Sequence, residues 1–276
     1  MDFAFTPALA LAHLTVLEVP PLQLVSLAAS IGYRAIGLRL YPAFAGSPFY
    51  ELPAGTAASR QMQQRLRDEG IHVNDVEFIG IGEHFDAREL TGLLDAASAL
   101  GAQRLSVCGD DPDVSRLTAN FASLCELAAP HGMRVELEYM AWRQVKRFED
   151  ALGVVSAAGK PNGGVLIDLL HLARTGGSPR DVHRAPAGAI RCVQLCDAAA
   201  AAPLTPEALL QEARSGRLPP GRGGLPLREF LAELPEGTAL SLEVPSDGSS
   251  SPEAHARDVF QATQEVFASM RTTGDA

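Results

Sequence analysis

Short apolar runs alternate with longer amphipathic segments along almost the whole chain. The apolar runs predict eight strands, at residues 11–14, 35–40, 72–78, 104–108, 134–138, 164–168, 191–195 and 239–243. Apolar residues at helical spacing predict helices within 20–32, 56–70, 87–101, 115–132, 144–159 and 251–270. Five of these helices are expected to end at glycines, namely Gly32, Gly70, Gly101, Gly132 and Gly159.

The order of these elements predicts the fold. Strands that alternate with helices pair in parallel, because parallel neighbours need a crossover connection between them. A doubly wound sheet shows the same alternation but usually has fewer strands, so eight units favour a single-domain (β/α)8 TIM barrel over residues 1–276. Two stretches are irregular: a long loop at 41–53, and the stretch 198–230, which we expect to form a lid.

Composition narrows the class of protein. Hydrophobic residues make up 46% of 276 residues, which is enough for a sizeable core, yet no apolar run reaches the roughly 18 residues of a membrane span. The first residues include Asp2 and lack the basic start of a signal peptide, so we expect a cytoplasmic protein with no membrane partner. A net charge of −10 repels phosphate backbones, so nucleic acid is not an expected partner. The four cysteines show no CxxC spacing and are expected to be reduced and buried.

Polar side chains end four consecutive strands in the second half of the chain. Such ends form the reactive face of a (β/α)8 barrel. The ends carry Glu138, Asp168, Gln194 and Glu243, with Asp197 shortly after the seventh strand. Three carboxylates together would repel one another unless a cation lay among them. Oxygen ligands without a thiolate suit Mg²⁺ or Mn²⁺, so this set predicts one divalent metal site.

Several of these residues have a structural interpretation as well. A single carboxylate at a strand end is often a helix N-cap, and a single histidine such as His171 often packs in a core. Glu136 lies on the same face of its strand as Glu138, so alternation does not distinguish them. Glu138 is preferred because it lies nearer the C-terminal rim.

The motifs resemble those of the sugar phosphate isomerase/epimerase family, also called xylose-isomerase-like TIM barrels. The resemblance covers almost the whole chain and rests on the order Glu138, Asp168-x-x-His171, Gln194-x-x-Asp197, Arg217-x-x-Pro-Gly and Glu243. In that family a Glu, an Asp, a His and a Glu at the ends of strands five to eight bind one divalent metal. The resemblance assigns these roles to Glu138, Asp168, Gln194 and Glu243. Glutamine in place of histidine is a harder, more weakly basic ligand, which keeps Mg²⁺ or Mn²⁺ ahead of Co²⁺ or Zn²⁺.

A second likeness is to bacterial 3-dehydroshikimate dehydratases. It is carried by Glu138 with Trp142 four residues later, by Asp168-x-x-His171, and by the segments VQLCDA (193–198) and RLPPGRG (217–223). Two reactions are therefore open, both of which remove a proton next to a carbonyl and form an enediolate. In an isomerase or epimerase, which we place first, Glu138 and Glu243 would shuttle the proton. In a dehydratase, His171 would transfer it.

Two further classes are weighed against these enzymes. A barrel that binds a ligand without catalysis would have no metal at the rim. A nuclease of abasic sites, which shares the barrel, is disfavoured by the negative charge and by the few histidines at strand ends. The enzyme interpretation is therefore preferred.

Arginines indicate what the substrate carries. Arg217, in a loop rich in proline and glycine, is expected to clamp a carboxylate or phosphate, unless it is solvated. Arg39, at the end of the second strand, points into the same mouth, unless it only pairs with Glu77. Glu77 is expected to bind substrate hydroxyls, and Trp142 to form a wall of the pocket. The predicted partner is a small polyhydroxylated or carboxylated molecule, and the sequence leaves a homo-oligomer open.

Overall fold

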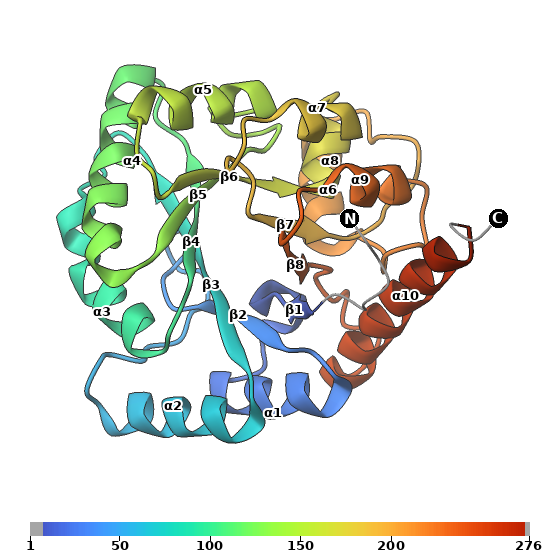
Figure 1. Ribbon diagram of the computed structural model, residues 1–276, viewed down its shortest axis with the longest axis horizontal. Coiled ribbons are helices and arrows are strands. Elements are labelled where there is room, and N and C mark those ends of the chain that lie inside the picture. The colour runs from blue at the N-terminus through green and yellow to red at the C-terminus, as the bar shows by residue number, and fades with distance from the viewer. Residues whose placement is uncertain (1–7, 274–276) are drawn as a thin grey trace.

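Eight parallel strands close into a barrel, in sequence order, in the computed structural model, which describes residues 8–273 (Figure 1). Each strand pairs with the next, and β1 pairs with β8. The strands are β1 (Leu9–Leu11), β2 (Ala35–Arg39), β3 (His72–Ile81), β4 (Arg104–Gly109), β5 (Arg134–Glu138), β6 (Gly163–Asp168), β7 (Cys192–Leu195) and β8 (Ala239–Leu242). The predicted (β/α)8 barrel is confirmed. The predicted domain also includes 1–7 and 274–276, which lie outside the described residues.

Helices surround the barrel in Figure 1. They are α1 (Pro21–Ile31), α2 (Ala57–Glu69), α3 (Thr91–Ala99), α4 (Val114–Ala128), α5 (Phe148–Ala158), α6 (Leu169–Arg174), α7 (Pro179–Arg184), α8 (Pro206–Ser215), α9 (Leu227–Glu233) and α10 (Pro252–Thr273). Helix α2 shows how capping residues set the ends of a helix. Thr56 caps its start by accepting a hydrogen bond from the Ser59 N–H, and Gly70 ends it in the left-handed region at φ 63°. Within residues 8–273, none of the helices has the length and apolar composition needed to span a bilayer.

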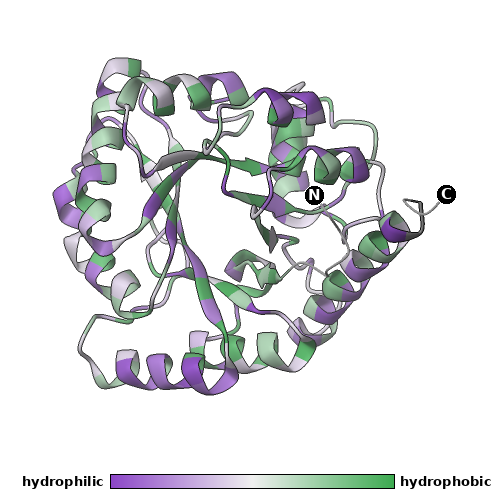
Figure 2. Cartoon of the chain, viewed as in Figure 1, coloured by the Kyte–Doolittle hydropathy of each residue, from purple (hydrophilic) through white to green (hydrophobic). Residues whose placement is uncertain are grey.

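The core has two parts, which Figure 2 distinguishes by hydropathy. Apolar faces of the outer helices pack against the outside of the strands, while hydrophilic positions recur along β3, β4 and β5. Part of this polar character lies inside the barrel, where Arg104 and Arg134 pair with Glu136. All four cysteines are buried and unpaired, as expected. The polar interior continues upward to the C-terminal rim, where the candidate site lies.

One prediction about local structure is corrected. The first strand was expected at 11–14, but β1 is Leu9–Leu11 and a 3-10 turn follows at His13–Val16. Thr15 ties this turn to the end of β8, because its hydroxyl donates to the Leu242 carbonyl (2.9 Å) and accepts from the Val244 N–H (3.1 Å). The stretch 198–230, expected to form a lid, contains α8 and the start of α9, and α8 contributes to the wall of the cavity at the rim; its role as a lid stays a prediction.

Candidate active site and metal centre

Three buried carboxylates lie at the C-terminal ends of β5, β6 and β8. Glu138 and Asp168 are the last residues of β5 and β6, and Glu243 directly follows β8. Their exposed fractions are 4%, 0% and 4%. Because the strands are parallel and closed into one barrel, these three ends meet at the same rim.

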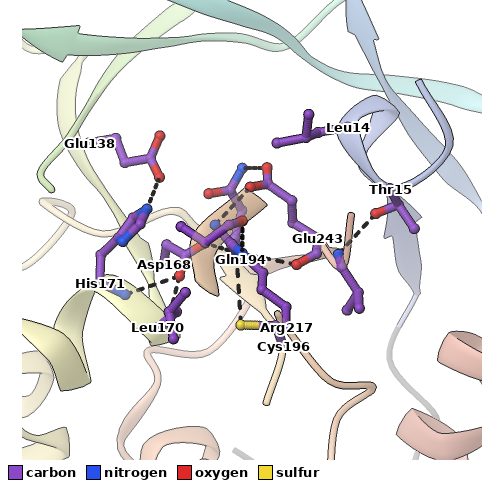
Figure 3. Close-up of polar contacts among 12 residues, drawn as sticks. Leu14, Thr15, Glu138, Asp168, Leu170, His171, Gln194, Cys196, Arg217 and Glu243 are labelled. Carbon is purple, nitrogen blue, oxygen red and sulfur yellow. Dashed lines mark hydrogen bonds and ion pairs between the residues drawn. The ribbon is translucent and has the colours of Figure 1, made fainter. Parts of the chain in front are cut away.

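Asp168 and His171 are brought together by the start of α6. Asp168 ends β6 and also caps α6, since its Oδ1 accepts from the N–H groups of Leu170 (2.7 Å) and His171 (3.2 Å). This cap places His171 in the first turn, with Nε2 3.6 Å from Oε1 of Glu138 (Figure 3). Potential ligand atoms of Glu138, Asp168 and His171 all lie within 4.8 Å of one another, which is compatible with a divalent ion. His171, which the sequence assigned only to proton transfer, is therefore also a candidate ligand.

Gln194 presents an amide oxygen without a partner to the same region. It is aligned with Asp168 across the β6–β7 pair, and its Nε2 donates to Oε2 of Glu243. Its Oε1 is buried, and no hydrogen-bond donor among residues 8–273 reaches it. An unpaired buried carbonyl oxygen is costly in an empty protein but suits a hard cation. These oxygen atoms are therefore suited to bind a divalent cation. The ligand set Glu138, Asp168, Gln194 and Glu243 stays a prediction.

Arg217 directs its guanidinium at the carboxylates. Its Nη1 donates to Oδ2 of Asp168 and to the backbone oxygen of Glu243 (3.2 Å), and its Nη2 lies 3.2 Å from Oε1 of Glu243. Its Nε donates to the carbonyl of Ala213 at 3.0 Å. Figure 3 shows this convergence. Arg217 is buried rather than solvated, and its donors are already used by protein acceptors, while its role as a substrate clamp stays a prediction.

Burial and charge set the protonation preferences of these groups. Burial, together with repulsion from Glu243 and Asp168, raises the pKa of Glu138 well above its ordinary value. Burial likewise raises the pKa of Glu243 to about 8, although Arg217 opposes it. Burial is the largest single influence on Asp168 and would raise its pKa, but the charge of Arg217, the nearby His171 and the hydrogen bonds that Asp168 accepts from both residues together lower it. Burial lowers the pKa of His171 to about 4, which keeps the imidazole neutral near pH 7. The site therefore has more carboxylates than positive charges to balance them.

Glu138, Glu243 and His171 line a cavity of about 140 Å³. The predicted substrate-binding residues Arg39, Glu77, Trp142 and Arg217 all line it. Trp142 packs edge-on against the His171 ring, with centroids 5.2 Å apart and planes at 83°. Glu77 accepts from the Leu14 N–H at 3.0 Å and lies 3.6 Å from Arg39.

Other lining residues were not identified from the sequence. They are Leu14, Ala43, Phe44, Phe78, Met140, Arg143, Leu210, Ala213 and Arg214. Arg143 directly follows Trp142, so the motif around Trp142 could have drawn attention to it. Arg214 lies three residues before Arg217 and could have been noticed in the same way. The remaining residues are apolar and carry no chemical signal in the sequence. Asp197, noted near the rim, instead holds the loop after β7, because it accepts from the N–H groups of Gly221 and Leu225 (both 3.0 Å).

Comparison with known proteins agrees with this architecture. The family described as xylose isomerase-like TIM barrels matches residues 25–269. The chain belongs to this family.

The relatives found by sequence are named as enzymes. A 3-dehydroshikimate dehydratase of Pseudomonas aeruginosa is 34% identical over 163 residues, which are 56% of this chain and 25% of the relative. One of Pseudomonas putida is 29% identical over 221 residues, covering 74% of this chain and 32% of the relative. An inosose isomerase of Halalkalibacterium halodurans is 28% identical over 138 residues, which are 48% of this chain and 47% of the relative. The chain thus spans only about a quarter to a third of the dehydratases that it matches.

Solved structures share the fold. A fusion of a xylose isomerase-like TIM barrel with a 4-hydroxyphenylpyruvate dioxygenase superposes with a TM-score of 0.77 at 24% identity, covering 98% of this chain and 44% of that one. The IOLI protein, described with a binding zinc atom, superposes with a TM-score of 0.75 at 18% identity, covering 96% of this chain and 99% of that one. At these identities the likeness concerns the fold alone.

Proposed function

We propose that the chain is a divalent-metal-dependent dehydratase of the 3-dehydroshikimate type. The observation that carries the proposal is the buried cluster of Glu138, Asp168 and His171 at the rim. Its carboxylates lack sufficient countercharge, and a neutral imidazole stands beside them. Two relatives found by sequence carry the name of this activity, each over about a third of its length or less.

The residues that would hold the ion are Glu138, Asp168, Gln194 and Glu243. The unpaired Oε1 of Gln194 is the feature that best supports this set. When bound, a divalent ion would supply positive charge to the substrate carbonyl and its neighbouring hydroxyl, and so stabilise an enediolate. The absence of a thiolate among these donors favours Mg²⁺ or Mn²⁺.

His171 would handle the proton. Its neutral ring accepts the proton from the carbon next to the carbonyl, which leaves the electron pair on the enediolate. That pair then expels the hydroxyl of the adjacent carbon, and the protonated ring returns its proton to form water. The net change is the loss of one water molecule. Glu138, 3.6 Å from Nε2, stabilises the protonated ring during the exchange, and Trp142 fixes its orientation.

An isomerase or epimerase, which the sequence placed first, is our second candidate here. Its proton would move between Glu138 and Glu243 on opposite sides of the substrate. Glu243 is tied to Gln194 and Arg217, so it is less free than Glu138 to act as a base, which favours a reaction with one base. The inosose isomerase relative supports this second candidate.

The test is incubation with 3-dehydroshikimate and, in turn, Mg²⁺, Mn²⁺, Co²⁺ and Zn²⁺. We expect the ultraviolet absorbance of an aromatic acid with at least one metal, and its loss in His171→Gln. The control is His72→Gln, an exposed histidine at the opposite end of the barrel. No absorbance with any metal, combined with exchange of a carbon-bound proton of an inosose into deuterated water, would favour the isomerase instead.

A further inference from the structure

The guanidinium of Arg39 is buried without a hydrogen bond. Arg39 ends β2, and its side chain is 6% exposed. No acceptor in the described part of the chain receives a hydrogen bond from this guanidinium, and its Nε is fully covered. Its Nη2 forms the ion pair with Oε2 of Glu77 that the sequence left open, but the separation of 3.6 Å is too long for a hydrogen bond. A buried charged donor in this condition is costly, unless a ligand in the adjoining cavity completes it.

The backbone of Arg39 is nevertheless held firmly. Its N–H donates to Nδ1 of His13 (2.9 Å), and its carbonyl accepts from the Tyr50 N–H (2.9 Å). The other ring nitrogen of His13 bonds to the carbonyl of Val19, and the ring stacks on Tyr50 at 5.2 Å. The backbone that carries the guanidinium is therefore held in place, as expected of a preorganised ligand-binding group.

Arg217 in the same cavity shows the opposite condition. Its Nε, Nη1 and Nη2 all face protein oxygens at the rim. Of these two buried arginines, Arg39 is the one with donors left for a substrate.

Glu77 limits the charge that such a substrate can bring. It is fixed by the Leu14 N–H, and its carboxylate lies beside the guanidinium. A carboxylate brings one negative charge and two coplanar oxygens that match a guanidinium edge. A phosphate group brings about 1.5 to 2 negative charges and a third oxygen near neutral pH. Placed at Arg39, it would be repelled by Glu77.

We propose that Arg39 and Glu77 form a subsite selective for carboxylates. Arg39 anchors the substrate carboxylate through two parallel hydrogen bonds, and Glu77 disfavours phosphate. The substrate class is then a carboxylated rather than a phosphorylated polyhydroxy carbonyl compound. The inference rests on the proposed function for the reaction that follows binding, but the subsite itself can be tested without turnover.

The first experiment uses titration calorimetry on Mn²⁺-loaded protein with 3,4-dihydroxybenzoate and with catechol, which lacks the carboxylate. Arg39→Gln should weaken binding of the acid about 100-fold and leave catechol unchanged. Arg39→Lys keeps the positive charge and serves as the second variant if Arg39→Gln is unstable. Its affinity for the acid should lie between those of the wild type and Arg39→Gln. Arg34→Gln, an exposed arginine just before β2, is the matched control. Binding of the acid to Arg39→Gln or Arg39→Lys at wild-type strength would overturn the inference.

The second experiment compares benzoate with phenyl phosphate at pH 7.5. The wild type should prefer benzoate, and Glu77→Gln should raise the affinity for phenyl phosphate about tenfold more than that for benzoate. An equal change for both ligands would contradict selection by Glu77. If the wild type binds the acid through Arg39 but does not convert 3-dehydroshikimate, the proposed function fails and the subsite stands. If conversion occurs while Arg39→Gln binds the acid normally, the subsite fails and the proposed function stands.

Discussion

Two glutamates of β5 lie two residues apart and face the same barrel interior, in different electrostatic surroundings. Glu136 is completely buried, with Arg134 Nε 3.2 Å from its Oε1 and Arg104 Nε 3.7 Å from its Oε2. Glu138, at the rim, has no arginine or lysine within ion-pair distance among residues 8–273, and its nearest basic group is His171. Burial raises the pKa of Glu136, but the two arginines oppose it, whereas repulsion from Glu243 and Asp168 adds to the effect of burial on the pKa of Glu138.

The difference supports the proposed division of roles, in which Glu136 serves the fold and Glu138 serves a ligand. The protein provides its own countercharge where a buried carboxylate only has to be tolerated. Where a cation or substrate is to bind, a buried carboxylate lacks a positively charged protein partner, and the ligand supplies the positive charge. A similar contrast separates Arg217, whose donors are used by protein oxygens, from Arg39, which pairs with Glu77 at 3.6 Å but donates no side-chain hydrogen bond within residues 8–273.

The largest effect is expected from Glu138→Gln. If Glu138 holds the metal and supports His171, turnover of the active substrate should fall about 1,000-fold or more. The free energy of unfolding should stay at or above that of the wild type, because the substitution removes repulsion inside the site. Steady-state kinetics and urea unfolding measure the two quantities. A variant with more than a tenth of wild-type turnover would contradict the role of Glu138.

Glu136→Gln should have the reverse profile. It leaves Arg104 and Arg134 without their buried counterion, which typically costs about 3 to 5 kcal/mol of stability. The metal affinity measured by calorimetry should stay within about threefold of the wild type. A stable Glu136→Gln protein that no longer binds metal would reverse the assignment of the two glutamates.

The sequence located the rim residues better than it located their partners. Glu138, Asp168 and Glu243 could be placed at the rim because each ends an apolar run, and the barrel brings strand ends together. Gln194 lies one residue before the end of β7 and was placed there by its position in the strand. Alternation alone did not separate Glu138 from Glu136. The arginines that do separate them lie in the adjacent strand β4 and at the start of β5, and only the barrel register shows which carboxylate they reach.

Contacts between distant segments account for the other differences. The turn after β1 depends on Thr15 bonding to Leu242, 227 residues away, so no local pattern could have placed it. Arg217 reaches Asp168 across 49 residues, from a loop whose composition gives no direction. The free guanidinium of Arg39 depends on the exact distance to Glu77 on the neighbouring strand, which periodicity does not determine.

A third, smaller effect is expected from metal addition. An ion that binds only the folded state stabilises it by about 2.7 kcal/mol when its concentration is 100 times the dissociation constant. Mn²⁺ should raise the melting temperature of the wild type and of Glu136→Gln, and EDTA should reverse the increase. Glu138→Gln should show little or no increase at the same Mn²⁺ concentration. Equal increases in the Glu136 and Glu138 variants would place the ion elsewhere.

The smallest effect concerns Asp75, a buried acid of β3 in the lower, structural part of the barrel interior. Burial, followed by the charge of Glu77, raises its pKa from 3.8 to about 6, although Asn74 and Arg104 oppose this. Because the folded pKa is the higher one, the folded state binds more protons than the unfolded state between pH 4 and pH 6. Stability due to this group is therefore present at low pH and is lost as pH rises through about 6.

The loss should amount to about 2 kcal/mol between pH 4 and pH 6. Asp75→Asn, which cannot ionise, should remove this part of the pH dependence of the unfolding free energy in urea titrations at several pH values. Asp95→Asn, on the outer helix α3, is the control and should leave the slope unchanged. If the unfolding free energy of Asp75→Asn has the same slope against pH as that of the wild type, the prediction is wrong. Asp75 would then be compensated by the neighbouring arginines as fully as Glu136 is.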